Sequence, residues 1–558
     1  MEGTALGDSI ILSIKKKTSG ALKLGGYSII CAEVPVDRLA ARKHMNDREN
    51  LDVLLVNPDD RNPVSNIPWG ILSVGSYLAN SCNRKVRLID ASIDGEDKLI
   101  ADLSDLAKQT PLIGLSIMSR YTPFLKRAAD TIKAANPACK VIVGGPHAVL
   151  CPEQTAAYAN IDFVAYGEGE FTLNALIDQI AKPDPDYSCV PGLIFRQADG
   201  SLQRTSIAPA APFYDVNYDL LDPKVLSTFG NYIQVLSGRG CSYKCTFCFN
   251  AVRGEKWRPR PAEEMVHEIE ALVARFNPKV VYFRDENFFQ GKQRTREFIR
   301  LYREKGFTFR WRANCRADYL NDSYINPDFL KELAEINCEA MKFGLESGSE
   351  RVLEAIKKKL RVSKVKRAIS WLSAEPRIRK YYSFLIGLPG ETTADYKATM
   401  RLVGWAIRAD PNAKIIGPQY YRLYPGGELY DQVKRDWNYQ APQSLEEWCR
   451  QYADPENDDG WDKGVEYPWV PEDGRWLAKN ASLLIDSYRR IYASETKVAW
   501  SPLKRLVLRL IQISLDARFR FGVYGGLVEF KLIGLLTRIY GSLKNLRRTQ
   551  TGGCLPLH

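Results

Sequence analysis

The sequence predicts an α/β protein with two successive parallel-sheet domains and a mainly helical C-terminal region. Strand-like apolar runs alternate with helical segments in two separate series. Glycines and charged residues recur directly after these runs, where parallel sheets bind their ligands. Three cysteines lie close together at the start of the second series. With 558 residues, the chain is long enough for two or three domains, each with its own core.

The composition narrows the class of protein. A content of 45% hydrophobic and 26% charged residues is typical of a globular protein. Twelve cysteines, scattered apart from one trio, indicate a reducing compartment rather than a disulfide framework. Because no signal peptide and no apolar run of about 18 residues is visible, we expect a cytoplasmic protein. The net charge of +12 is compatible with a nucleic-acid partner. Because the basic tail lacks an aromatic stacking platform, we expect no nucleic-acid binding.

The first series predicts a doubly wound parallel sheet over residues 51–182, after a variable extension at 1–50. Strands are expected at 51–57, 85–90, 112–117, 140–143 and 162–165, with helices at 70–79, 122–135, 152–159 and 170–181. Residues 183–230 are expected to form a linker. Within it, a hairpin is predicted to turn at Asp199 and Gly200.

Unusual residues collect after the predicted strands of this first domain. Ligands of doubly wound sheets lie beyond the carboxyl ends of the strands, so these residues are candidates for binding. They are Asn57, Pro58, Pro68, Trp69, Gly70, Ser116, Gly144, Gly145, Pro146, Gly167 and Glu168. Two structural explanations stay open: paired glycines can form a tight turn, and residues 167–170 can cap the next helix.

The second series predicts a partial (β/α)6 barrel over residues 231–437. Strands are expected at 232–236, 279–283, 308–313, 340–343, 382–386 and 414–423. Polar side chains recur where successive strands end, which is where (β/α) barrels carry their active sites. They include Asp285, Glu286, Arg316, Glu346 and Ser347. We therefore expect a functional site at this end of the barrel.

The cysteine trio follows the first strand of the barrel. Cys241, Cys245 and Cys248 lie within eight residues, on a loop that can bring their thiols to one centre. A closed zinc site needs a fourth ligand, and the nearest candidates are Cys315 and His267, a distant cysteine and a mid-helix histidine. An iron–sulfur cluster held by three cysteines leaves one iron open for a ligand. A zinc site with a distant ligand and three unrelated cysteines are the alternatives.

The motif Cys-x3-Cys-x2-Cys, with Phe247 before its last cysteine, resembles the signature of the radical S-adenosylmethionine (SAM) enzymes. In that family the open iron of a [4Fe-4S] cluster binds the amino and carboxylate groups of SAM. One electron, from a donor such as flavodoxin or ferredoxin, then splits SAM to a 5′-deoxyadenosyl radical.

The resemblance also implies roles for residues at the barrel strand ends. Asp285 or Glu286 would accept a hydrogen bond from the SAM ammonium group, and Arg316 would pair with its carboxylate. Ribose would be contacted by Glu346 and Ser347, and adenine by Ile386 with the backbone of Tyr424 and Pro425. A structural ion pair would equally explain Asp285 or Arg316.

Residues 51–182 resemble the cobalamin-binding domain that precedes some radical SAM domains. Pro68, Trp69 and Gly70 at the first helix and the strand-end loops carry this resemblance. The motif Asp-x-His-x-x-Gly, which supplies an axial histidine to cobalt in other cobalamin proteins, does not occur. The resemblance therefore implies that no histidine of the protein binds the cobalt, and that the loop 61–68 lies under its lower face. His147 is interpreted as a turn or tail contact.

Residues 438–558 are expected to form a helical cap over the barrel mouth and a basic amphipathic tail. The cap contains Trp448, Trp461, Trp469 and Trp476. The first apolar stripe of the tail consists of Leu503, Leu506, Val507, Leu510 and Ile511, and the second of Leu532, Leu535, Leu536, Ile539 and Leu543. These stripes predict two helices that either pack on the fold or rest on the anionic inner membrane surface through residues 501–548.

Taken together, the resemblance implies a cobalamin-dependent radical SAM methyltransferase. It would use a [4Fe-4S] cluster, SAM and cobalamin to methylate an unactivated carbon, or a phosphinate, of a small molecule. The sequence leaves the substrate open among lipids, sugars and natural-product intermediates. Two alternatives remain: a radical oxidase or cyclase of the anaerobic porphyrin cyclase type, and a non-catalytic cobalamin or redox sensor.

Overall fold

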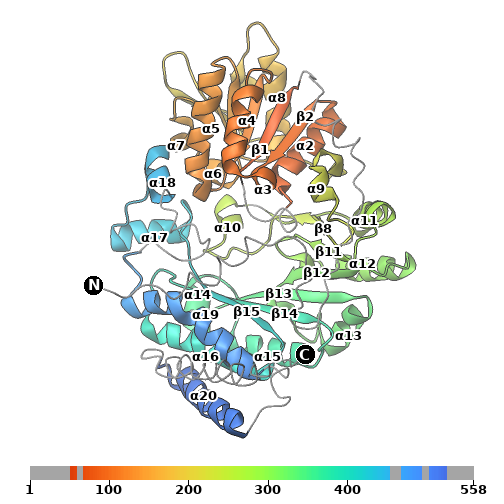
Figure 1. Cartoon of the computed structure of the whole chain (residues 1–558), viewed down its shortest axis with the longest axis vertical. Coiled ribbons are helices and arrows are strands. Elements are labelled where there is room, and N and C mark those ends of the chain that lie inside the picture. The colour runs from red at the N-terminus through yellow and green to blue at the C-terminus, as the bar shows by residue number, and fades with distance from the viewer. Residues whose placement is uncertain (1–50, 59–66, 255, 453–466, 493–501, 524–558) are drawn as a thin grey trace, which may run out of the picture. The chain divides into compact units, whose positions relative to one another are not determined.

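The computed structural model describes residues 51–58, 67–254, 256–452, 467–492 and 502–523. All of them belong to one compact unit. Two parallel sheets follow each other along the chain, each with its own helices (Figure 1).

The first sheet has seven strands in the order β2-β1-β3-β4-β5-β6-β7. Its strands are β1 (Val53–Asn57), β2 (Val86–Asp90), β3 (Leu112–Ser116), β4 (Lys140–Gly144), β5 (Phe163–Ala165), β6 (Leu193–Arg196) and β7 (Leu202–Arg204). The five parallel strands were predicted from their apolar runs. The predicted hairpin also exists, but β6 pairs antiparallel with β5 and extends the sheet. It thereby covers a strand edge that would otherwise expose unpaired backbone groups.

Helices cover both faces of this sheet (Figure 1). They are α2 (Trp69–Cys82), α3 (Ala91–Asp94), α4 (Glu96–Leu106), α5 (Thr122–Ala135), α6 (Pro146–Leu150), α7 (Pro152–Ala156) and α8 (Gly169–Ile180). Successive side chains of a strand point to opposite faces. Accordingly, Leu54 and Val56 of β1 pack in the core with α4 and α5, while Val53 and Leu55 pack with α2 and α8.

The second sheet is an arc of six parallel strands in the order β15-β14-β13-β12-β11-β8. The strands are β8 (Tyr232–Val235), β11 (Val280–Phe283), β12 (Arg310–Cys315), β13 (Cys338–Glu346), β14 (Arg379–Ile386) and β15 (Lys414–Tyr420). Its helices are α11 (Ala262–Phe276), α12 (Lys292–Glu304), α13 (Pro327–Glu335), α14 (Glu350–Ala355), α15 (Val362–Ser373) and α16 (Thr393–Ala409). Since β8 and β15 do not pair within the described part of the chain, the barrel stays open, as predicted.

Short elements surround the cysteine loop. A two-stranded ribbon of β9 (Gly238–Arg239) and β10 (Arg258–Pro259) flanks it, and α10 (Phe249–Arg253) begins directly after Cys248. The ribbon places Arg239 only two residues before the first cysteine of the trio. The loop is therefore fixed at both ends by regular structure.

The C-terminal region contains α17 (Glu428–Trp437), α18 (Leu445–Tyr452), α19 (Glu472–Tyr492) and α20 (Pro502–Phe521). The prediction of a cap over the barrel mouth is wrong for α18, because this helix packs on α5 of the first sheet. Leu445 is buried in that core, and the indole nitrogen of Trp448 donates to Gln154 at 2.9 Å. Trp469 lies at the barrel end instead, donating to the carbonyl of Gly387 at 3.0 Å. Trp461 lies outside the described residues.

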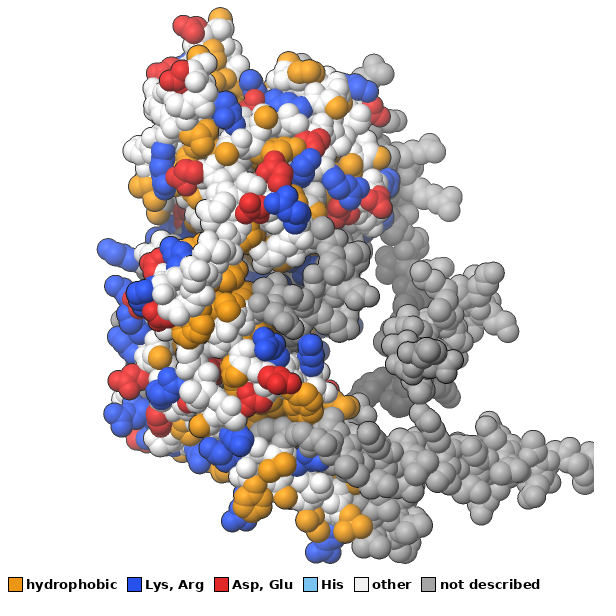
Figure 2. Space-filling view, turned by 90° about the vertical axis from the view of Figure 1, so that its left-hand side faces the viewer, with side chains coloured by type: hydrophobic (Ala, Val, Ile, Leu, Met, Phe, Trp, Pro, Cys, Tyr) orange, Lys and Arg blue, Asp and Glu red, His pale blue; other side chains and the backbone are white. Residues whose placement is uncertain are grey.

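Helix α20 packs on α16 and α19 through Leu515 and Phe519, which are both buried. Its opposite side exposes Leu510, Ile513 and Phe521, so it keeps an uncovered apolar stripe. Figure 2 shows apolar side chains exposed at the bottom of the face it displays. Of the first predicted stripe, only Leu510 and Ile511 have described side chains; the second stripe lies wholly outside the described residues. Among the described helices, none is long and apolar enough to cross a membrane.

Candidate functional site

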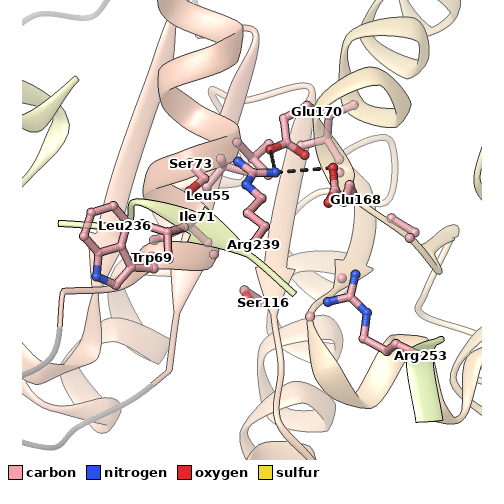
Figure 3. Close-up of a pocket in the computed structure, with 18 of the residues that line it drawn as sticks. Leu55, Trp69, Ile71, Ser73, Ser116, Glu168, Glu170, Leu236, Arg239 and Arg253 are labelled. Carbon is pink, nitrogen blue, oxygen red and sulfur yellow. Dashed lines mark hydrogen bonds and ion pairs between the residues drawn. The ribbon is translucent and has the colours of Figure 1, made fainter. Parts of the chain in front are cut away.

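The carboxyl ends of the first sheet's strands border a cavity of about 340 Å³, the corrin-side cavity (Figure 3). Seven of the predicted cobalamin contacts line it: Trp69, Gly70, Ser116, Gly144, Gly145, Gly167 and Glu168. Asn57, Pro58, Pro68 and Pro146 do not line it. Asn57 instead donates to Asp90 at 3.2 Å, which joins the ends of two neighbouring strands.

Glycines make one wall of the corrin-side cavity almost free of side chains. At Gly145, φ is +87° and a Cβ would lie 2.7 Å from the nitrogen of Ile117, so only glycine fits. At Gly144, a Cβ would meet no atom within 4 Å, which shows open space above the backbone. Such a wall lets a large planar ring approach the backbone closely, so these residues fit cobalamin.

No histidine lines the corrin-side cavity within the described part of the chain. His147, two residues after Gly145, is fully buried, with Nδ1 3.1 Å from the hydroxyl of Ser119 and its ring edge-on to Trp448. Burial lowers the pKa of His147 to about 4, so its ring is neutral at physiological pH. This position agrees with its interpretation as a turn contact. The loop at 59–66 lies outside the described residues.

The barrel domain supplies the other wall of the corrin-side cavity, and none of its residues was predicted as a cobalamin contact. It contributes Leu236, Gly238, Arg239, Gly240, Phe249, Asn250, Arg253, Arg284 and Glu286. Figure 3 shows Arg239 reaching between Glu168 and Glu170. Its guanidinium donates to Glu170 at 2.8 Å and to the hydroxyl of Tyr214 at 2.9 Å. Arg258 forms a further ion pair with Glu168.

A second cavity, of about 520 Å³, lies at the carboxyl ends of the barrel strands. All three cysteines of the trio line this SAM-side cavity. Burial raises the pKa of the Cys248 thiol to about 11, and it also raises the pKa of Cys241. Because only thiolates bind metals, these cysteines require a positively charged centre to ionise them.

The spacing of the thiols distinguishes the kinds of centre they could hold. In the described part of the chain, no three His, Cys, Asp or Glu side chains lie close enough to bind one metal ion. A tetrahedral zinc ion needs all its ligands about 2.3 Å from one point. In a [4Fe-4S] cluster each cysteine binds a different iron, so the sulfurs lie farther apart. The geometry of the trio therefore fits the cluster better than zinc.

Arg316 lies beside Cys245 in the SAM-side cavity. One terminal nitrogen of its guanidinium is 3.6 Å from the Cys245 sulfur, and Nε donates to Asp318 at 2.9 Å. The guanidinium also lies 3.5 Å from the ring centroid of Tyr243. Arg316 therefore contacts the cysteine loop as well as lining the cavity.

Glu346 ends β13 in an uncommon conformation. Its φ is +65°, and the pairing of β13 with β14 shifts register between Gly344 and Glu346. Its carboxylate accepts from the ammonium group of Lys358 at 2.7 Å, and both side chains are only 8% exposed. Left-handed backbone in a residue other than glycine costs about 1–3 kcal/mol and is concentrated at functional sites.

Five predicted SAM contacts line the SAM-side cavity: Phe247, Glu286, Arg316, Glu346 and Tyr424. Four others, Asp285, Ser347, Ile386 and Pro425, do not. Asp285 is 2% exposed and accepts two hydrogen bonds from Ser237, at 2.7 Å each, with Arg294 at 3.7 Å. Burial raises its pKa. Asp285 therefore has a structural role, and Glu286, pointing the other way, is the residue that faces the cavity.

Ser347 and Ile386 are also turned away from the cavity. The hydroxyl of Ser347 lies 3.0 Å from that of Thr399, and Ile386 is fully buried in the core. Several residues that the prediction missed do line the cavity: Met118 and Arg120 from the first sheet, and Asn287, Asn314, Lys342, Lys358 and Gln419 from the barrel. Lys342, a charged residue in the middle of a buried strand, was the one recognisable signal in the sequence.

The two cavities share part of their walls. Asn250 and Glu286 line both of them. Asn250 belongs to α10, directly after the last cysteine, and Glu286 follows β11. A molecule at this junction can therefore reach both cavities.

Comparison with known proteins agrees with this arrangement. A profile of the B12 binding domain matches residues 65–177, and a profile of the Radical SAM superfamily matches residues 235–403. The uncharacterized methyltransferase PH0819 of Pyrococcus horikoshii is 26% identical over 403 residues, 68% of this chain and 83% of the relative. The anaerobic magnesium-protoporphyrin IX monomethyl ester cyclase of Rubrivivax gelatinosus is 23% identical over 381 residues, 66% of each chain.

Two solved structures share the fold. The cobalamin-dependent S-adenosylmethionine radical enzyme OxsB superposes with a TM-score of 0.60 at 19% identity, covering 88% of this chain and 76% of that chain. The radical S-adenosylmethionine methyltransferase TsrM from Kitasatospora setae gives 0.56 at 19% identity, covering 70% and 77%. Both matched domains, their order and the two cavities lead to one conclusion. The chain belongs to the radical SAM enzymes that carry a B12-binding domain, and its cofactors are a [4Fe-4S] cluster, SAM and cobalamin.

Proposed function

We propose that the protein is a cobalamin-dependent methyltransferase that acts on an unactivated carbon of a small-molecule or lipid-like substrate. The observation that carries this proposal is the junction of the two cavities at Asn250 and Glu286. A substrate held at this junction could be reached from the SAM side and from the corrin side. The Pyrococcus horikoshii relative is named a methyltransferase, which supports the proposal.

The protein's residues would bind and orient the cofactors. When bound, the cluster with SAM supplies a 5′-deoxyadenosyl radical, and cobalamin supplies a methyl group. Cys241, Cys245 and Cys248 would hold the cluster, and Arg316 would position Cys245 through the contact of its guanidinium with the sulfur. The glycine wall of the first sheet would receive the corrin ring.

Two carboxylates would orient SAM. Glu286 faces the junction and would accept a hydrogen bond from the ammonium group of SAM. Glu346, held by Lys358, would face the ribose from the end of β13. Both residues come from strand ends of the barrel, which is a rigid part of the fold and keeps them in place.

Anaerobic reconstitution with iron, sulfide and hydroxocobalamin tests the proposal. The protein should then cleave SAM under a strong reductant, and the products should be measured by mass spectrometry with candidate lipids, sugars and peptides. A methyltransferase gives S-adenosylhomocysteine and 5′-deoxyadenosine in equal amounts. 5′-Deoxyadenosine with little S-adenosylhomocysteine would indicate an oxidase or cyclase, as the Rubrivivax relative is named. Cobalamin binding without SAM cleavage would indicate a sensor.

We also propose that the protein works in the cytoplasm and contacts the membrane surface through α20. Leu510, Ile513 and Phe521 are exposed on this helix, with Arg509 next to Leu510 and Arg520 next to Phe521. Apolar side chains between basic ones suit an anionic lipid surface. Co-sedimentation with anionic and neutral vesicles tests the contact, and Leu510→Ser with Ile513→Ser should abolish it.

A further inference from the structure

A continuous run of positive charge lies next to the cysteine loop. Between Ala355 and Ala374 the chain has no Asp or Glu and seven basic residues: Lys357, Lys358, Lys359, Arg361, Lys364, Lys366 and Arg367. Only Lys358 is buried; the other six side chains are exposed. The run covers the turn after α14 and the first half of α15. Neither cofactor cavity uses any of these exposed side chains.

This turn is attached directly to the loop that carries the cysteines. The backbone nitrogen of Thr246 donates to the carbonyl of Ile356 at 3.1 Å. The guanidinium of Arg316 donates to the carbonyl of Lys358 and also lies 3.6 Å from the Cys245 sulfur. One guanidinium group therefore separates a cysteine of the trio from the backbone of the surface turn.

The backbone of the turn favours residues other than lysine. Lys357 has a φ of +52° and Lys359 a φ of +56°, both in the left-handed region where glycine and asparagine fit best. Lysine at these positions lowers the stability of the fold relative to glycine. Its presence there indicates that the positive charge has a function. Lys357 pairs with Glu428, but both side chains are at least half exposed, so this ion pair is weak.

We call Lys357, Lys359, Arg361 and Lys364 the basic patch. We propose that the basic patch is the docking surface for a small acidic electron-carrier protein of the flavodoxin type. The inference rests on the proposed function, because that function requires one electron for each SAM cleaved. The reduced flavin of the carrier would lose one electron, and the cysteine-bound cluster would gain it.

Charge complementarity and proximity favour this partner. An acidic surface is steered towards a cluster of like basic charges, and steering speeds association most at low ionic strength. Electron-transfer complexes are weak and bury less than about 1,200 Å² in total, so a small patch is sufficient. The patch offers such a carrier an approach to Cys245 across one turn of the chain.

The test compares two triple variants of the full-length, reconstituted protein. The patch variant is Lys359→Gln, Arg361→Gln and Lys364→Gln. The control variant, Lys98→Gln, Lys108→Gln and Lys331→Gln, loses the same charge at exposed positions on α4 and α13 and in the turn after α4. Isothermal titration with an acidic flavodoxin at low and high salt gives Kd for each protein.

We expect Kd of the patch variant to rise about tenfold at low salt and the difference to shrink at high salt. The control variant should stay within about twofold of the wild type. Stopped-flow reduction of the cluster by reduced flavodoxin should slow in parallel. With dithionite in place of the carrier, the patch variant should cleave SAM at the wild-type rate, which separates docking from damage to the site.

Equal Kd values for the patch and control variants would overturn the inference, as would a wild type that binds no flavodoxin. An unchanged flavodoxin Kd with lost binding to anionic phospholipid vesicles would assign the patch to a membrane and also overturn it. Failure of the wild type to cleave SAM with dithionite would contradict the proposed function instead. The binding comparison does not depend on that reaction, so the two failures are distinguishable.

Discussion

Replacing Arg239 with methionine should weaken the contact between the first domain and the barrel domain. Arg239 donates to Glu170 at 2.8 Å and to Tyr214 at 2.9 Å. Its side chain is 16% exposed and that of Glu170 only 2%, so the variant leaves a buried carboxylate without its cation. Removing one partner of a buried ion pair costs about 3–5 kcal/mol. Because Arg239 keeps some exposure, we expect about 3 kcal/mol, measured as the free energy of unfolding in urea.

A double-mutant cycle isolates this ion pair. Glu170→Gln should recover part of the loss in the Arg239→Met background, because the uncompensated charge is then gone; we expect a coupling energy of about 2 kcal/mol. Arg204→Met is the matched control, since Arg204 and Glu153 form an ion pair with both side chains more than half exposed. It should cost less than about 1 kcal/mol. An Arg239→Met loss as small as that of the control would refute the reasoning.

Three further predictions follow from the structure. Cys245→Ala should prevent cluster assembly, seen as loss of the iron–sulfur absorbance after anaerobic reconstitution, and a wild-type iron content would contradict the ligand assignment. Glu286→Gln should weaken SAM binding about tenfold, measured by equilibrium dialysis, without loss of stability. Asp285→Asn should instead lower the free energy of unfolding by about 1–3 kcal/mol, because Asp285 accepts two buried hydrogen bonds. The reverse result would exchange the roles of the two residues. Burial opposes ionisation of Asp395, but hydrogen bonds from Arg351 and other neighbours outweigh it and lower its pKa to about 2. Since that pKa is below the unfolded value of about 3.9, Asp395 stabilises the fold fully above that value, and about 2–3 kcal/mol is lost as pH falls through 2. Asp395→Asn should flatten the urea stability profile between pH 4 and 2, and an unchanged slope would contradict the assignment.

The order of strands and helices could be predicted because the apolar pattern of each element is strong. The run Val53–Asn57 is apolar at four successive positions, as expected of a strand buried on both faces. The hairpin at Asp199 and Gly200 was equally readable from its turn residues. The pairing of this hairpin with β5 could not be predicted from the sequence, because β5 has a free edge only once the sheet is assembled.

The site was predicted at the level of loops and less well at the level of single side chains. Asp285 and Glu286 are adjacent carboxylates after one strand, and only the register of the finished sheet decides which of them faces the cavity. The same holds for Glu346 and Ser347, where a register shift turns the backbone. The second wall of the corrin-side cavity was missed because no pattern within one domain specifies the surface of another.

Helix α18 ties the C-terminal region to the first domain through Leu445 and Trp448, while Arg239 fastens the same domain to the barrel through Glu170. Because two separate contacts hold the first domain, it cannot rotate away from the rest of the chain without breaking both of them. A bulky corrinoid gripped in this way would stay in place over many turnovers. SAM and substrate would exchange around it, while the corrinoid itself would remain bound.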